Sequence, residues 1–302
     1  MQGGSRRTRA EPDSCHISVA LLVTLVAALL SCKTAPQKPS SVQQSSAQDV
    51  EAISDVSFPF SAPPPAALSG KLYRPQGAGP FPAAILMHGC AGRAIGGTGM
   101  DNVALRLRES GYVALEVDSL QWRSVTAVCD GKRPTPYDRV EDAFAARRYL
   151  SSLPFVDPDR IALVGWSHGG ITALLTWARK SEEARTASFA AIAAYYPLCA
   201  VDSDLYEDED VASAAAPLLI LIGERDDWLP ATLCRSFVDL ATKIGRDASL
   251  TVYPGATHAF DSVEGGKPVE FMGHRLVPDP AAALASRERL LGFLDGTLKR
   301  KK

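Results

Sequence analysis

Six short apolar runs, separated by longer amphipathic segments, constrain the fold of this chain most strongly. Apolar runs of this length without alternating polar residues are typical of strands that are buried on both faces. Strands that alternate with helices predict a mostly parallel sheet covered by helices on both faces, an α/β fold. The runs are Ala84–His88, Tyr112–Asp118, Ile161–Gly165, Phe189–Tyr196, Leu218–Gly223 and Leu250–Pro254.

The segments around these runs complete the predicted fold. Three of them place apolar residues on one stripe at helical spacing, and they are Arg139–Ser152, Ala231–Ile244 and Pro280–Leu294. A further helix is expected from Ser167 to Arg179. The runs VSFPF and LSGKLYRP, which precede the first buried strand, predict an antiparallel hairpin at the entrance to the sheet.

The first 31 residues have the layout of a secretory signal peptide. Arg6, Arg7 and Arg9 precede the apolar run Ile17–Leu30, which is shorter than the roughly 20 residues that a membrane-spanning helix needs. The stretch Leu29–Cys32 resembles the bacterial lipoprotein cleavage box, which implies that Cys32 carries lipid and becomes the new N-terminus. The alternatives are a plain cleaved signal and an uncleaved anchor. We expect an exported protein of the bacterial cell envelope, held at a membrane by lipidated Cys32.

Residues 32–50 are predicted to be a disordered tether, because they are rich in Ser, Gln, Pro and Lys and contain little to bury. Residues 51–302 then form one globular domain of sufficient length for a sizeable core. The formal net charge of −2 gives no indication of a nucleic-acid partner.

Ser167 lies between Gly165 and Gly169, directly after a predicted strand and before a predicted helix. In this setting a Gly-x-Ser-x-Gly pattern forms a nucleophile elbow, a sharp turn that exposes the serine oxygen above the sheet. The helix N-terminus favours negative charge that develops there. The alternative is that Ser167 only caps the helix.

A serine nucleophile needs a histidine base and a carboxylate that orients it, in the chain order Ser, Asp or Glu, His. His258 follows the last apolar strand and is the predicted base, whereas His274 lies in a segment that we expect to be irregular. The loop after Leu218–Gly223 supplies Glu224, Asp226 and Asp227. We predict that Asp226 is the acid and keep Asp227 as the alternative.

An oxyanion formed on the substrate needs hydrogen-bond donors. The backbone N–H of His168, directly after the serine, is one candidate, and the N–H of Cys90 in the turn His88–Gly92 is the other, with Ala91 as its alternative. The side chain of His88 is expected to be structural.

Six motifs together resemble the dienelactone hydrolase family of α/β-hydrolases, and the resemblance covers most of residues 55–298. They are HGCAG, VDS, GWSHGG, YYPLC, LLILIGERDDWLPATLC and YPGATHAF, in this order. The resemblance implies the α/β-hydrolase fold without a large lid, and a triad of Ser167, Asp226 and His258. The namesake of the family uses a cysteine nucleophile. The serine in this chain therefore points to a serine esterase on the same scaffold, and not to dienelactone as the substrate.

Four cysteines follow the tether, and an even number in an exported protein suggests disulfides. Cys199 and Cys234 come after successive strands and so lie at the same end of the sheet, and Cys90 and Cys129 also lie on loops above the strands. We predict the pairs Cys199–Cys234 and Cys90–Cys129. A metal site is the less favoured alternative, because no close Cys-x-x-Cys spacing occurs. No metal and no cofactor are expected.

Two functions fit the sequence. The first is a serine hydrolase of a small ester or lactone, with Trp166 and Trp228 either lining its substrate pocket or packing in its core. The second is a catalytically silent hydrolase fold that serves as a surface binding protein. The acidic run Tyr206–Ser213 is expected to be either a solvated loop or a substrate gate.

Overall fold

The computed structural model describes the chain from residue 52 to residue 299, apart from residues 61–65, 179–187, 201–215 and 262–265. All described residues belong to one unit of the chain, Ser45–Lys302. The predicted signal peptide, the tether with Cys32 and the acidic run Tyr206–Ser213 lie outside the described residues.

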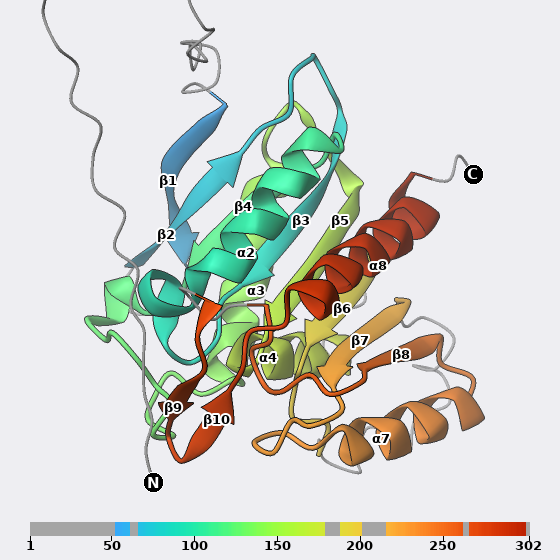
Figure 1. Cartoon of the computed structure of the whole chain (residues 1–302). Coiled ribbons are helices and arrows are strands. Elements are labelled where there is room, and N and C mark those ends of the chain that lie inside the picture. Colours follow the sequence, from blue (N-terminus) through green and yellow to red (C-terminus); the bar gives the residue numbers. More distant parts are fainter. Residues whose placement is uncertain (1–51, 61–65, 179–187, 201–215, 262–265, 300–302) are drawn as a thin grey trace, which may run out of the picture. The chain divides into compact units, whose positions relative to one another are not determined.

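Eight strands form one sheet in the order β1-β2-β4-β3-β5-β6-β7-β8 (Figure 1). From β4 to β8 neighbouring strands are parallel, while β1 pairs antiparallel with β2, and β2 with β4. The strands are β1 (Ile53–Phe60), β2 (Ala66–Tyr73), β3 (Phe81–Met87), β4 (Val113–Asp118), β5 (Val156–Trp166), β6 (Ala191–Tyr195), β7 (Leu218–Gly223) and β8 (Ala248–Tyr253). A separate two-stranded hairpin consists of β9 (Val269–Phe271) and β10 (His274–Leu276).

Helices cover both faces of the sheet (Figure 1). Helices α2 (Gly92–Glu109) and α8 (Pro280–Leu298) contact each other and lie on one face, and α3 (Asp138–Ser151) and α4 (His168–Trp177) lie on the other. Helix α7 (Ala231–Lys243) packs against β7 and β8, and its Phe237 ring lies 5.8 Å from the Trp177 ring of α4. The short helix η1 (Gln121–Arg123) follows β4.

All six predicted buried strands are present, and the predicted entrance hairpin is β1–β2. The sequence did not predict helix α2, whose first turns contain several glycines that lower helix propensity. Burial of Met100, Val103 and Leu107 stabilises this helix instead. The expectation that His274 lies in an irregular segment was wrong, because His274 begins β10. Pairing with β9 defines that strand, and its three residues are too short to leave a pattern in the sequence.

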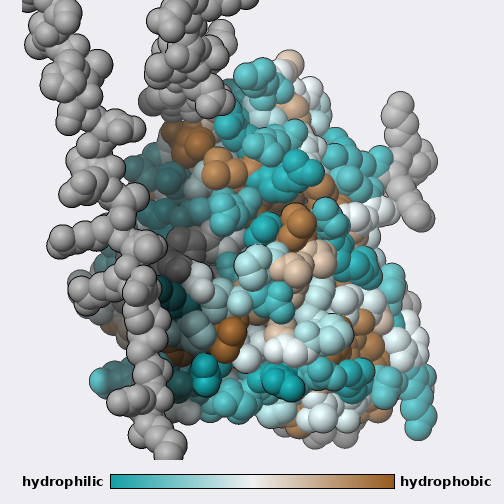
Figure 2. Space-filling view, in the orientation of Figure 1, coloured by the Kyte–Doolittle hydropathy of each residue, from teal (hydrophilic) through white to brown (hydrophobic). Residues whose placement is uncertain are grey.

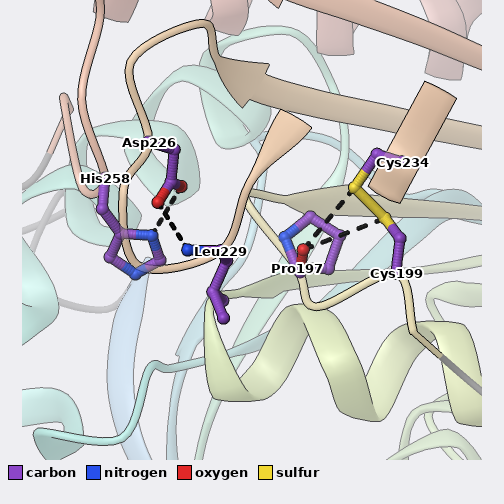
Figure 3. The surroundings of a disulfide bond; sticks show 6 residues. All are labelled: Pro197, Cys199, Asp226, Leu229, Cys234 and His258. Atoms are coloured by element: carbon purple, nitrogen blue, oxygen red, sulfur yellow. Dashed lines mark hydrogen bonds and ion pairs between the residues drawn. A yellow bond between two sulfur atoms is a disulfide. The ribbon is translucent and has the colours of Figure 1, made fainter. Parts of the chain in front are cut away.

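Both predicted disulfides are present. Cys90 is bonded to Cys129, and Cys199, after β6, is bonded to Cys234 in α7. The carbonyl oxygen of Pro197 lies 3.8 Å from the Cys199 sulfur and 3.6 Å from the Cys234 sulfur (Figure 3). The second bond is buried, whereas the cysteines of the first are partly exposed.

The visible surface carries hydrophilic residues with hydrophobic ones scattered among them (Figure 2). Within the described ranges, no helix has the length and apolar character needed to cross a membrane. Those same ranges contain no group of three or more His, Cys, Asp and Glu side chains that could hold a metal ion.

A buried polar cluster lies between the sheet and α2. Glu116 of β4 is fully buried, accepts a hydrogen bond from the Tyr73 hydroxyl (2.9 Å) and forms an ion pair with Arg93 (3.2 Å). Burial raises the pKa of Glu116 to about 7, and the neighbouring carboxyl group of Asp101 raises it further, although Tyr73 and Arg93 oppose this shift. Glu116 therefore takes up a proton on folding in mildly acidic solution.

Glu116 should make the stability of the fold depend on pH. Between pH 4.5 and 7 the unfolded chain releases this proton and the folded chain keeps it, so unfolding becomes easier as the pH rises, by up to about 3 kcal/mol in total. In Glu116→Gln this contribution disappears. We therefore expect the melting temperature of the variant, minus that of the wild type, to be higher at pH 8 than at pH 4. Thermal melts followed by circular dichroism measure the difference, with the exposed Glu288→Gln as the control. A difference independent of pH would contradict the assignment.

Candidate active site

Ser167 occupies a strained turn between β5 and α4. Its φ angle of 51° lies in the left-handed region, which a residue with a side chain adopts at a cost of about 1–3 kcal/mol. Its backbone N–H donates to the Tyr195 carbonyl (2.9 Å), and its carbonyl accepts from Ile171 (2.9 Å). Ser167 is at the N-cap position, but its side chain makes no capping hydrogen bond. The capping alternative is therefore wrong, and the hydroxyl is available for another partner.

The two glycines of the motif are required by close backbone contacts. A Cβ atom on Gly165 would lie 2.0 Å from the Gly169 carbonyl oxygen, and one on Gly169 would lie 2.2 Å from the Met87 carbonyl oxygen. Both distances are far below van der Waals contact. Any larger residue would thus displace the turn that presents Ser167.

His258 joins Ser167 to Asp226. The Ser167 hydroxyl lies 3.0 Å from His258 Nε2. His258 Nδ1 lies 2.7 Å from an Asp226 carboxylate oxygen, and Figure 3 draws this second contact. Asp226 and His258 are buried, with exposed fractions of 4% and 2%. The other Asp226 oxygen accepts hydrogen bonds from the backbone N–H groups of Trp228 (3.1 Å) and Leu229 (2.8 Å). These contacts favour the tautomer in which Nδ1 donates to Asp226 and Nε2 accepts from Ser167.

The alternative residues from the sequence have other partners. Asp227 is exposed and contacts His274 Nδ1 (3.2 Å), so these two form a separate pair at the surface. Glu224 is exposed and accepts from the Gly255 backbone N–H (3.0 Å). Of the three acidic residues in the loop, Asp226 is the one that contacts His258 within the part of the chain that the structure describes.

The two tryptophans have different positions. Trp166 is 4% exposed, stacks on Tyr195 with ring centroids 4.9 Å apart, and donates its indole N–H to Asp261 (3.0 Å). It therefore packs in the core and does not line an open pocket, contrary to that part of the expectation. Trp228 is half-buried, and its ring lies 5.1 Å from His258 and stacks on His274 at 4.8 Å. It forms a wall beside His258.

The turn that contains Cys90 packs against Ser167. A Cβ atom on Gly89 would lie 3.6 Å from the Ser167 Cβ, so this turn passes directly beside the serine. The Cys90 carbonyl accepts from Val128 (2.8 Å), next to the disulfide with Cys129. The Cys90 N–H has no backbone acceptor within the described part of the chain. The His168 N–H, at the start of α4, has no partner within the helix.

His88 supports the same turn. It is buried, its Nδ1 donates to the Gly89 carbonyl (2.7 Å), and its Nε2 accepts from the Ser119 N–H (3.2 Å). Burial, and then the positive charge of Arg139, lower its pKa well below the usual value. His88 is therefore neutral and structural, as the sequence predicted.

Three residues near the site were not predicted. Asp261 accepts from Trp166 and from the Tyr196 hydroxyl (2.6 Å), and the Tyr196 ring lies 4.7 Å from that of His258. Arg139 is fully buried beside His168. A signal for Arg139 was present, because it shares the i, i+4, i+7 stripe of α3 with the buried Ala143 and Ala146.

The parallel sheet and the line from Ser167 through His258 to Asp226 define an α/β-hydrolase. The model of the dienelactone hydrolase family matches residues 68–297, and the chain belongs to this family. It is accordingly a hydrolase that acts on esters or lactones.

Individual relatives agree with this assignment. A protein of Bradyrhizobium sp., named "Probable 2-oxo-3-(5-oxofuran-2-ylidene)propanoate lactonase", is 29% identical over 201 residues, which cover 63% of this chain and 77% of that protein. A dienelactone hydrolase-like promiscuous phosphotriesterase from metagenomic libraries has a TM-score of 0.61 at 19% identity, over 82% of this chain and 99% of that one. A thermophilic esterase from Thermogutta terrifontis has a TM-score of 0.54 at 21% identity, over 76% and 87%. The two structures show the shared fold.

The different environments of the two aspartates lead to a paired prediction. Asp226→Ala should lower kcat for a nitrophenyl ester by about ten-thousand-fold, because the imidazole loses the carboxylate that orients it. Asp227→Ala should change kcat by no more than about threefold, because this exposed side chain contacts His274 instead. Steady-state kinetics of both variants provide the measurement. A severe loss in Asp227→Ala with a mild one in Asp226→Ala would overturn the choice of acid.

Proposed function

We propose that the chain is a serine hydrolase that cleaves a small carboxylic ester or lactone through an acyl-enzyme on Ser167. The observation that carries this proposal is the hydrogen-bonded line from Ser167 through His258 to buried Asp226. A structural serine would not need a strained backbone, a histidine at hydrogen-bond distance and a buried carboxylate behind that histidine.

The reaction follows from this geometry. Ser167 Oγ attacks the carbonyl carbon and gives its proton to His258 Nε2, and Asp226 stabilises the imidazolium through Nδ1–H. When the tetrahedral intermediate collapses, the bond to the leaving oxygen breaks, and that oxygen takes the proton from Nε2. Water activated by His258 then attacks the acyl-enzyme in the same way and releases the acid. In a lactone, the leaving oxygen remains part of the acyl group as a hydroxyl, and the second step releases one hydroxy acid.

The backbone N–H groups of His168 and Cys90 are proposed to donate hydrogen bonds to the oxyanion of the tetrahedral intermediate, with Ala91 as the alternative to Cys90. Their proposed role is supported by the His168 N–H, which has no partner within helix α4, and by the turn beside Ser167. The disulfide from Cys90 to Cys129 restrains that turn. Loss of one such donor typically lowers kcat by about a hundred- to a thousandfold.

Trp228 is proposed to form one wall of the substrate pocket. Its half-buried ring lies beside His258 and also stacks on His274. The Bradyrhizobium relative is named as a lactonase. This name supports lactones as one substrate class to assay, together with nitrophenyl esters of graded acyl length.

An activated serine can be distinguished from a silent binding fold with a fluorophosphonate probe, which labels only a nucleophilic serine. We expect labelling of wild type at Ser167 and none in Ser167→Ala, together with a loss of ester turnover of about a million-fold. Mass spectrometry of the labelled peptide locates the modification. Full ester turnover in Ser167→Ala would refute the mechanism, and an unlabelled, inactive wild type would favour the binding protein.

We also propose that the protein is exported and anchored by lipid on Cys32. The basic residues, the apolar run and the sequence Leu29–Cys32 support this proposal, and two disulfides fit an oxidising compartment. Stable anchoring requires at least two acyl chains, because each CH₂ group buried in the membrane contributes only about 0.8 kcal/mol to the binding free energy. A flexible tether of residues 33–50 would span roughly 20–25 Å and leave the domain free to meet soluble substrates.

The anchoring proposal is tested with Cys32→Ser in an otherwise unchanged precursor. This variant should carry no lipid and should move from the membrane fraction to the soluble fraction, while folded protein retains its Ser167 chemistry. Mass spectrometry of the mature N-terminus and fluorophosphonate labelling provide the two measurements. If the wild-type membrane fraction carries an unmodified Cys32, or is cleaved elsewhere, the anchoring proposal fails independently of the hydrolase proposal.

A further inference from the structure

Arg139 is a buried charge that the proposed reaction does not use. Its side chain is fully buried near the start of α3, where an arginine is costly without partners. Its Nη1 lies 2.8 Å from Nδ1 of His168. Its Nε and Nη2 have no hydrogen-bond partner among the described residues. The contact with His168 is thus the one hydrogen bond of the Arg139 side chain in the described part of the protein.

Other charged groups near Arg139 do not replace this contact. Asp142 is buried and lowers the cost of the charge, but its two oxygens bind Arg123 at 2.7 and 2.9 Å. Burial lowers the pKa of Arg139 to about 10, so the guanidinium is still charged at neutral pH. A guanidinium has only N–H donors, and therefore Nδ1 of His168 must accept. The proton of the His168 ring is consequently on Nε2.

His168 is neutral as well as fixed in one tautomer. Burial, and then the positive charge of Arg139, lower its pKa to about 3, and Asp138 opposes the shift. The residue is half-buried, directly follows Ser167, and its Nε2 has no partner within the described ranges. The chain therefore holds an oriented, uncharged N–H donor one residue from the proposed nucleophile.

We infer that His168 Nε2–H donates a hydrogen bond to a second oxygen of the substrate, and that Arg139 is a positioning residue for this donor. The inference rests on the proposed hydrolysis at Ser167. In the acyl-enzyme the acyl group is bonded to Ser167, so the donor next to Ser167 acts on the acyl side. The donor is close to the reacting carbon, and the second oxygen that it binds must therefore lie near the scissile carbonyl. The substrate class is thus esters or lactones whose acyl group carries an oxygen next to the scissile carbonyl, and 2-oxo acyl esters represent this class in the test.

Two esters of equal length test this inference, ethyl 2-oxobutanoate and ethyl butanoate. The measured quantity is the ratio of their kcat/KM values, which removes effects common to both substrates, and comparison with wild type removes the greater intrinsic reactivity of the oxo ester. His168→Phe keeps a planar ring without a donor and should lower the ratio by about three- to tenfold, as expected for the loss of one hydrogen bond. His168→Gln retains an N–H donor and should restore part of it.

Arg139 is tested with the same ratio. Arg139→Met should lower the ratio in the same direction as His168→Phe, and Arg139→Lys, which keeps a cationic donor, should restore part of it. Arg148→Met removes an exposed arginine from the same helix and should leave the ratio at the wild-type value. Fluorophosphonate labelling at Ser167 shows that each variant compared is folded.

The outcomes separate this inference from the proposed function. A wild-type ratio in labelled, active His168→Phe would overturn the inference and leave the hydrolase proposal standing. A lowered ratio in His168→Phe with a wild-type ratio in Arg139→Met would overturn the positioning role of Arg139. A wild type that hydrolyses neither ester and is not labelled would overturn both the proposed function and this inference.

Discussion

The close packing of the β5–α4 turn against the end of β3 is the constraint on which the site depends. Without side chains, Gly165 and Gly169 allow backbone atoms to approach to distances that a Cβ atom would prevent. This contact forces Ser167 into a left-handed conformation, and the surrounding core, with β3 and β5 buried on both faces, holds it there. The result is a hydroxyl group that projects above the sheet and points to His258.

The remaining parts of the site are brought together by the sheet. Parallel strands end at the same edge, so the loops after β3, β7 and β8 deliver Cys90, Asp226 and His258 to Ser167 although they are far apart in the chain. Local contacts then fix each loop. The Cys90–Cys129 disulfide and His88 hold the first, and two backbone N–H groups hold the carboxylate of Asp226 in the second.

Buried polar groups around the site are arranged in pairs that set protonation. Asp226 fixes the tautomer of His258, and Arg139 fixes that of His168 with the opposite choice of nitrogen. The first arrangement leaves Nε2 as an acceptor for the serine proton, and the second leaves Nε2 as a donor. Two histidines near one serine therefore have complementary chemistry, because one faces a carboxylate and the other a guanidinium.

The sequence by itself determined the parallel sheet and the elbow at Ser167, because burial on two faces and glycine spacing leave direct local patterns, and it favoured both disulfide pairs through the order of the strands and loops. It also favoured Asp226 over Asp227, but it could not show that the adjacent aspartates bind different histidines. The tertiary structure alone placed Trp166 in the core, formed the β9–β10 hairpin and put Arg139 beside His168. These features depend on contacts between segments that are far apart in the sequence. The free energy of such contacts depends on how far the neighbouring residues exclude water, and no local sequence pattern records those neighbours.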